Sequence, residues 1–194
     1  MKTEDKALVL DFLPLGRSSD YKTEPIAQLL GKDFFTLLEV IPKQGIELKA
    51  LDEVYVGKDE RPVIEFIKRR ISHKELTNNS LTELEKAVET IVLGDEKRFV
   101  EFYNISRSIT LKRHQIELLP GMGKKHMLQI LSTREKGLFT SFKDMKERVF
   151  GIPDPVAAIV KRVIEELEDG PEMKHYLFVR PPSQEREFRP RRRM

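Results

Sequence analysis

The hydrophobic pattern of the chain from its start to Ile71 is that of short strands separated by turns. Apolar runs at residues 6–13, 25–30 and 34–41 each end near proline or glycine, the residues that most often interrupt strands and form turns. Residues 47–56 lead into a Gly-Lys-Asp turn sequence, and residues 63–71 have the period of two of a strand, although a helix also fits them. Five short strands with tight turns predict a small, partly open β-barrel of the OB type, with an SH3-like barrel as the alternative.

The pattern changes to a helical period at residue 80. Ser80 and Glu83 have the spacing of a capping box, so Ser80 is the predicted start of a helix that ends at Gly94. Asp95 is placed to cap a second helix. The predicted fold is α+β: an OB-like barrel over residues 1–79, bridging helices over 80–105, an all-α helical domain over 106–172 and an extended basic tail over 173–194.

Composition excludes several classes of protein. The 194 residues include no cysteine, which excludes disulfide scaffolds, Cys-ligated metal sites and a cysteine nucleophile. No run approaches the roughly 20 apolar residues of a membrane helix, and the first residues lack the apolar core of a signal peptide. We therefore expect a cytoplasmic protein without a membrane partner. P-loop and nucleophile-elbow motifs are absent from the sequence, so we expect no enzyme.

The most informative motif is Leu119-Pro-Gly-Met-Gly-Lys-Lys125. A short helix is expected to end just before it and a second amphipathic helix to begin at Lys124. Glycines permit a positive φ and leave room for an approaching ligand, and the start of a helix favours an anion. The motif therefore predicts a phosphate contact, or, as the alternative, a helix–turn–helix corner without a ligand. The residues expected to take part are Gly121, Met122, Gly123, Lys124, Lys125, Arg113 and His126.

An internal repeat accompanies this motif. Shifting the chain so that Gly121 falls on Gly151 places the first turn on Val149-Phe-Gly-Ile-Pro153. Ser141 and Asp154 are placed to cap the helices on either side of the second turn. The second copy has a proline in place of the second glycine and an aspartate in place of the first lysine. We therefore predict a degenerate, structural second hairpin.

The formal net charge of +3 conceals an uneven distribution. Residues 1–105 carry 16 Lys and Arg against 20 Asp and Glu, whereas residues 106–136 carry 7 against 2. The degenerate repeat, residues 142–172, carries 5 Lys and Arg against 8 Asp and Glu. Residues 173–194 carry 7 Lys and Arg against 2 Asp and Glu. Positive charge is thus concentrated where the glycine hairpin favours phosphate, which indicates nucleic acid as the partner.

Two further basic segments are candidates for phosphate contact. Lys68-Arg69-Arg70 is the one dense basic run of the acidic half, and either contacts phosphate from the barrel surface or forms a solvated strand face. Tyr55 and Phe66 are nearby candidates for base stacking, although Phe66 is more typical of a core. The tail arginines Arg191, Arg192 and Arg193 predict a basic arm or simply a solubilising end.

Five segments of the chain carry a resemblance to a known family: Asp52–Arg61, Ile67–Ser72, Arg98–Asn104, Leu118–Met127 and Glu147–Pro155. Through them the whole chain resembles an archaeal family, domain-of-unknown-function family 655, described as predicted OB-fold nucleic-acid-binding proteins. The resemblance implies an N-terminal OB-like domain and a C-terminal helix-hairpin-helix domain, and no established activity. Helix-hairpin-helix proteins bind phosphate through hairpin amides, and some hold a monovalent cation on hairpin carbonyls. The resemblance assigns these positions to Gly121, Met122 and Gly123.

These observations predict a nucleic-acid-binding protein, with RNA ahead of DNA, that contacts the phosphate backbone largely independently of sequence. One alternative is a protein-interaction adaptor, in which the acidic barrel binds a basic partner in a ribosome or repair assembly. The other is a Mg²⁺-dependent nuclease. No cofactor is expected apart from a possible monovalent cation at the hairpin. His114 and His126 flank the hairpin, and a metal ion bound by both of them is a further alternative.

Overall fold

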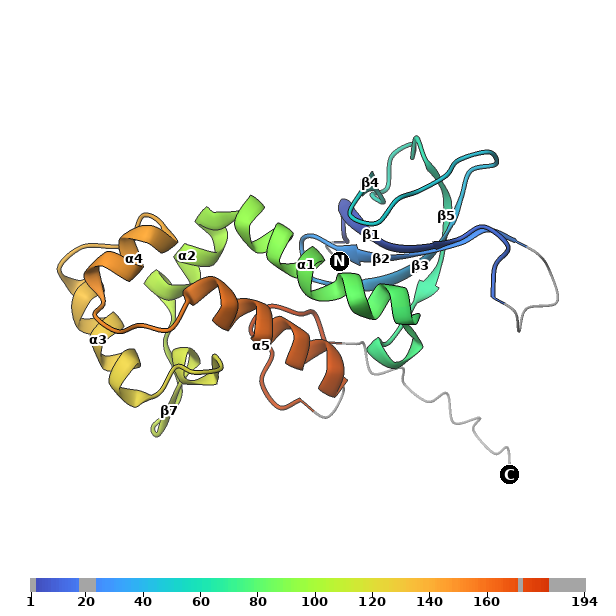
Figure 1. The fold of residues 1–194 in the computed structure, drawn as a ribbon. Coiled ribbons are helices and arrows are strands. Elements are labelled where there is room, and N and C mark those ends of the chain that lie inside the picture. The colour runs from blue at the N-terminus through green and yellow to red at the C-terminus, as the bar shows by residue number, and fades with distance from the viewer. Residues whose placement is uncertain (1–2, 18–23, 171–172, 182–194) are drawn as a thin grey trace, which may run out of the picture.

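A curled antiparallel sheet forms the N-terminal part of the protein. The computed structural model describes residues 3–17, 24–170 and 173–181, and within them a mixed α+β fold (Figure 1). The strands of the first sheet are hydrogen-bonded in the order β4-β1-β2-β3-β5, with every described pair antiparallel. Their bounds are β1 Lys6–Leu13, β2 Ile26–Gly31, β3 Leu37–Pro42, β4 Glu53–Tyr55 and β5 Ile64–Arg70.

The central strands β1, β2 and β3 are largely buried on both faces, which explains their almost continuous apolar sequences. Along β1, Ala7 and Val9 point into the curled sheet, where they join a core that includes residues of β2, β3, β4 and β5. Leu8 and Leu10 point to the opposite face and belong to a second, larger core shared with the helices. Strands β2 and β3 are buried at every position.

Helix α1 covers the outer face of the sheet, and four further α-helices make up much of the remaining described structure. Their bounds are α1 Asn78–Gly94, α2 Glu96–Ile105, α3 Lys124–Glu135, α4 Phe142–Arg148 and α5 Pro155–Asp169. Helix α1 packs against β1 and β2 on one side and against α5 on the other (Figure 1). The larger core therefore runs from the sheet into the helices without interruption. None of the described helices has the length and apolar character needed to cross a membrane.

Helix α1 begins earlier than the sequence predicts. Thr77, not Ser80, is its N-cap, and the Thr77 side chain accepts a hydrogen bond from the Ser80 backbone N–H. The Ser80 hydroxyl instead donates to Oε1 of the buried Gln28, at 2.7 Å. Gln28 also accepts from the Thr77 N–H, so a strand residue positions the start of the helix. This tertiary contact explains why the local capping signal at Ser80 was misleading.

The predicted strand at 47–56 is much shorter than expected. Strand β4 covers only residues 53–55, because Leu51 has a φ of 68° and turns the chain. The Asp52 carboxylate accepts from the Lys49 N–H, and the Leu51 N–H donates to the Val9 carbonyl. A leucine at positive φ has no sequence signature, so the turn was not predictable.

The C-terminal part is not all-α as predicted, because a two-stranded ribbon precedes the hairpin. Strand β6 (Ser108–Thr110) pairs with β7 (Arg113–His114). The predicted short helix before the hairpin is a single 3-10 turn, η2, at Gln115–Leu118; another, η1, lies at His73–Glu75. The ribbon escapes prediction because its two-residue tip, Leu111-Lys112, contains none of the residues typical of hairpin turns.

Candidate nucleic-acid interface

The glycine hairpin is a tight turn followed directly by a helix. The Met122 N–H donates to the Leu119 carbonyl at 3.0 Å, which closes a four-residue turn. Gly121, the third residue of the turn, has a φ of 81°, and Pro120 is the second. Proline followed by a glycine at positive φ is the pattern of a type II turn. The turn delivers the chain to α3 with Met122 buried and the two glycines exposed.

Gly123 is the N-cap of α3, and no side chain caps the helix there. Its φ of −87° and ψ of 179° suit any residue, and a Cβ built on it would meet no atom within 4 Å. Neither backbone conformation nor internal packing therefore requires a glycine. The first N–H groups of a helix have no intrahelical acceptor, and the space beside Gly123 at the start of α3 is open. Lys124 and Lys125 add positive charge to the same turn.

The second turn repeats the geometry of the first. Gly151 has a φ of 68°, and the Ile152 N–H donates to the Val149 carbonyl at 3.4 Å. The turns lie against each other, since a Cβ on Gly121 would be 3.7 Å from Cβ and Cγ of Pro153. The internal repeat predicted from the sequence is thus a pair of related turns in space.

Their helix starts differ in one respect. The carboxylate of Asp154 caps α5, as predicted, by accepting from the N–H groups of Val156 and Ala157. Ser141 likewise caps α4, as predicted. Among the described residues, the first amides of α5 thus have an acceptor in the protein's own carboxylate, whereas no side chain caps the start of α3.

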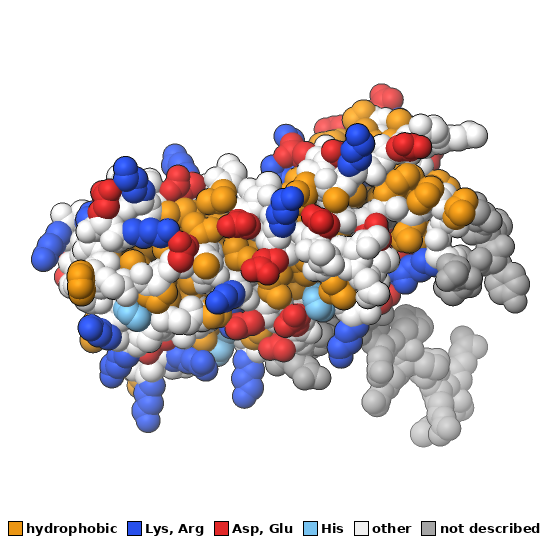
Figure 2. Space-filling view, viewed as in Figure 1, with side chains coloured by type: hydrophobic (Ala, Val, Ile, Leu, Met, Phe, Trp, Pro, Cys, Tyr) orange, Lys and Arg blue, Asp and Glu red, His pale blue; other side chains and the backbone are white. Residues whose placement is uncertain are grey.

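Basic side chains of the helical part include two contrasting groups. Arg134, Arg148 and Arg162 hold the fold together: Arg134 donates to Tyr103 and Ser106, Arg148 donates to carbonyls at the end of α3, and Arg162 pairs with Glu166. Lys and Arg gather on the underside of this part of the molecule (Figure 2). The second group, on the ribbon and α3, consists of cations with no side-chain partner among the described residues: Arg107, Lys112, Arg113, Lys124, Lys125 and Lys136.

An open groove of about 560 Å³ joins the ribbon to the hairpin. Its lining includes Arg113 of β7, the turn residues Gly121–Gly123, and Arg162 and Glu165 of α5. Glu117 also lines the groove, but its carboxylate accepts the His114 N–H at 2.9 Å. The structure therefore brings Arg113 together with the hairpin, as the sequence predicted. His126 is half-buried in the first turn of α3.

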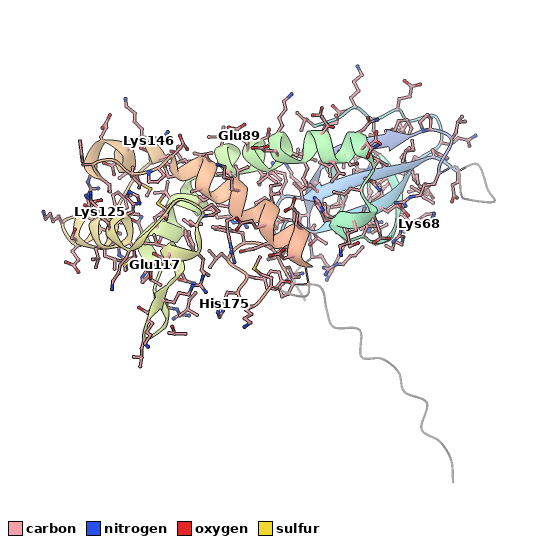
Figure 3. All side chains as sticks on the ribbon, turned by 60° about the horizontal axis from the view of Figure 1, so that its bottom comes forward. Lys68, Glu89, Glu117, Lys125, Lys146 and His175 are labelled. Carbon is pink, nitrogen blue, oxygen red and sulfur yellow. The ribbon has the colours of Figure 1, made fainter. Side chains whose placement is uncertain are left out.

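The basic run on β5 lies far from the hairpin. Figure 3 shows Lys68 and Lys125 at opposite ends of the molecule, so the two segments cannot contact the same phosphate. Arg69 pairs with the buried Glu39, at 3.2 Å, and with Glu75. Lys68 lies 3.9 Å from Glu39, and Arg70 is exposed. Carboxylates of the protein itself thus neutralise part of this positive charge. This favours a strand face over a phosphate contact for the basic run.

Further expectations concern two aromatic side chains, the tail arginines and a metal site. Phe66 is 45% exposed on β5, so its expected place in the core was wrong. Tyr55 is half-buried, and its hydroxyl donates to Asp59. The tail residues Arg191, Arg192 and Arg193 lie outside the described residues. Within residues 3–17, 24–170 and 173–181, no group of three or more His, Asp or Glu side chains is arranged to hold a metal.

Comparison with known proteins agrees with the sequence resemblance. A family model described as a protein of unknown function, DUF655, matches residues 3–180. The chain belongs to the DUF655 family. The uncharacterized protein MJ0038 of Methanocaldococcus jannaschii is 42% identical over 179 residues, 92% of this chain and 81% of that protein. The crystal structure of Af1531 from Archaeoglobus fulgidus is 45% identical with a TM-score of 0.85, covering 91% of this chain and 100% of that one.

The comparisons establish the family and the fold of this DUF655 protein, and its relatives are archaeal. None of the names states an activity. The element of the candidate site that sequence reasoning missed is the β6–β7 ribbon. The only signal in the sequence was the cluster of cations around Leu111.

His114 is a buried titratable side chain at the base of the ribbon. Its Nδ1 accepts the Ile116 N–H at 3.2 Å. Burial, reinforced by the positive charge of Arg134, lowers the pKa of His114. The unfolded chain therefore binds a proton more readily than the folded one, and stability contributed by neutral His114 is lost as the pH falls below the unfolded pKa of about 6.5.

We expect the melting temperature to fall between about pH 7 and pH 5 more steeply in the wild type than in His114→Asn. Asparagine keeps an acceptor for the Ile116 N–H but does not titrate. Thermal denaturation of both proteins across this range measures the difference. Parallel pH profiles would show that His114 does not sense pH.

Proposed function

We propose that this protein binds nucleic acid, RNA ahead of DNA, by holding the phosphate backbone at the hairpin of residues 119–125. The observation that carries the proposal is Gly123, a glycine that neither the backbone nor the packing requires and that borders open space at an uncapped helix start. Backbone N–H groups at such a position suit a phosphate oxygen. Lys124 and Lys125 add charge that a bound phosphate would neutralise. Contact of this kind carries little sequence information.

We further propose that the protein combines an OB-like barrel with a helix-hairpin-helix domain. The order and curl of the first sheet support an OB-like barrel, and the two related turns support a pair of helix-hairpin-helix units, the second of them degenerate. Met122 is buried beneath the first turn and holds it against the core. By the family resemblance, carbonyls of Gly121, Met122 and Gly123 would hold a monovalent cation that orders the hairpin around the phosphate.

The salt dependence of binding tests this proposal. For wild-type protein on a mixed-sequence RNA duplex and its DNA counterpart, we expect the logarithm of the affinity to fall linearly with the logarithm of the salt concentration. Lys124→Glu/Lys125→Glu should weaken binding about 100-fold. It should also reduce the magnitude of this salt slope by about two, because each phosphate contact contributes close to one to the slope. Fluorescence anisotropy across a salt series measures both.

The matched control reverses two exposed lysines of α1 and α2, Lys86→Glu/Lys97→Glu, which changes the net charge equally. We expect this control to weaken binding less than about fivefold, as a long-range effect of charge. Equal losses in the two double variants would mean that net charge, and not the hairpin, determines binding.

A groove on another part of the molecule favours a second candidate function, that of a protein-interaction adaptor. It has a volume of about 1500 Å³ and lies between the sheet, α2 and residues 177–178. Five carboxylates line it, none of them in an ion pair with another described residue: Asp5, Asp33, Asp59, Asp95 and Glu101. Aromatic rings lie among them, including those of Phe34 and Phe102. Carboxylates beside aromatic faces suit an arginine-rich segment of a protein partner.

Binding of a synthetic arginine-rich peptide, measured calorimetrically, tests this second function. We expect Asp95→Lys/Glu101→Lys to weaken it at least tenfold, which corresponds to about 1.4 kcal/mol. Glu89→Lys, on the exposed face of α1, serves as the control. Unchanged affinity in the groove variant would exclude the groove as the docking site.

A further inference from the structure

The β6–β7 ribbon carries an apolar side chain at its tip that folding does not explain. Leu111 has a relative exposure of 108%, so it is at least as open to solvent as in an extended peptide. Leucine is not a residue that two-residue hairpin turns favour, and Leu111 belongs to neither hydrophobic core. Its neighbours at the tip, Lys112 and Arg113, are exposed cations without a side-chain partner among the described residues.

The base of the ribbon is firmly attached to the body of the protein. The Gln115 N–H donates to the Arg107 carbonyl at 3.0 Å, and the Gln115 side chain accepts the Arg107 N–H at 2.9 Å. Arg134 of α3 donates to the carbonyls of Tyr103 and Ser106, which lie just before the ribbon. The tip therefore projects from a fixed base, and its direction relative to α3 is set by the fold.

The ribbon and the hairpin form one surface. Arg113 lines the groove that also contains Gly121 and Gly123. The ribbon projects from the body beside α3 in Figure 1, and from the part of the molecule that carries Glu117 and Lys125 in Figure 3. A nucleic acid whose phosphate is held at the hairpin would thus lie against the ribbon as well. Arg107, Lys112 and Arg113 would draw its backbone towards the tip.

From this arrangement we propose that the ribbon is a wedge, with Leu111 inserted at a weakly stacked step of a double-stranded nucleic acid, such as one beside an unpaired nucleotide. The inference rests on the proposed function, because the hairpin must first hold the backbone. An apolar side chain that enters between two base pairs must unstack them. The free-energy cost of this unstacking is smallest where stacking is already interrupted. The ligand is therefore a duplex with a local defect. Its RNA and DNA forms share this chemistry.

Binding to matched duplexes tests the wedge. The probes are a perfect RNA duplex, the same duplex with one unpaired nucleotide, and the two DNA equivalents, each with 2-aminopurine beside the defect position. We expect wild-type protein to bind the defective duplex about tenfold more tightly and to raise its 2-aminopurine fluorescence by unstacking the base. The pair of duplexes with the larger binding preference and fluorescence change shows whether the ligand is RNA or DNA.

Leu111→Ala should abolish both the preference and the fluorescence change while leaving affinity for the perfect duplex within about twofold, because the cations remain. Leu111→Phe should retain both. The control is Leu138→Ala, which removes an exposed leucine outside the ribbon and should change neither. Since the Leu111 side chain contacts no core, these variants are expected to fold.

A preference that survives Leu111→Ala overturns the wedge. If Lys124→Glu/Lys125→Glu still abolishes binding in that case, the proposed hairpin function stands without it. Failure of the wild type to bind any of the four duplexes overturns the wedge and the proposed function together. Self-association that Leu111→Ala removes, with duplex binding unchanged, would assign the tip to a protein contact and likewise overturn it.

Discussion

Replacing Gly123 with aspartate is expected to abolish nucleic-acid binding without unfolding the protein. The N-cap backbone at this position accommodates aspartate, and the new Cβ would meet no atom within 4 Å. The carboxylate would accept the free N–H groups of α3, as Asp154 does at the start of α5. It would then occupy the place of the phosphate and repel it. Loss of charge-assisted hydrogen bonds worth about 2–3 kcal/mol corresponds to a loss of about 100-fold in affinity.

The stability of the same variant separates this effect from damage to the fold. Aspartate is at least as good an N-cap as glycine and interacts favourably with the helix dipole, so the melting temperature should stay the same or rise by about 1–3 °C. Gly94→Asp is the control, because it adds the same charge at an exposed glycine of α1 where a new Cβ also meets open space. A Gly123→Asp protein that folds normally and binds as tightly as the wild type would refute the hairpin as the phosphate site.

Replacing Glu166 with alanine is expected to cause the largest loss of stability. Its side chain is fully buried and accepts four hydrogen bonds, from Arg162 at 2.9 Å and from the N–H groups of Leu177, Phe178 and Val179 at 2.7–3.0 Å. Alanine would leave the buried guanidinium of Arg162 without its closest carboxylate. Breaking such a pair from one side costs about 3–5 kcal/mol, equivalent to a fall of about 6–20 °C in melting temperature.

Chemical denaturation followed by circular dichroism measures this change. Glu165→Ala is the matched control: Glu165 lies one position earlier on α5, is about half exposed and is 3.5 Å from Arg162. We expect it to cost less than about 1 kcal/mol, as exposed ion pairs do. If Glu166→Ala also lowers the free energy of unfolding by less than about 1 kcal/mol, this carboxylate does not anchor residues 177–179 to the helix.

The parts of the fold that were predictable from the sequence are those set by local chemistry. The turn residues after β1 and β3 mark real strand ends, and Ser141 and Asp154 cap the helices for which their positions suit them. The shift that places Gly121 on Gly151 in the sequence also relates the two turns in space, down to a positive φ at each glycine.

What escaped prediction depends on contacts between distant segments. The start of α1 is decided by Gln28, which lies on strand β2, far from it in the chain. The charge of Arg69 is balanced by Glu39, whose position opposite it in the sheet is invisible in the sequence. The β6–β7 ribbon has no turn signature at its tip, so no strands were predicted there. The sequence therefore indicated the hairpin and Arg113 as candidates, but not the ribbon that carries Arg113.

The most direct test of the hairpin as a phosphate site is a titration of ¹⁵N-labelled protein with a short duplex, followed through the backbone amide resonances. We predict that the largest shifts fall on the amides of Gly123, Lys124 and Lys125. The amides of Val156 and Ala157, which Asp154 already occupies, should shift little. Equal shifts at the two helix starts, or shifts confined to the acidic groove between the sheet and α2, would contradict the hairpin as the site where this protein holds nucleic acid.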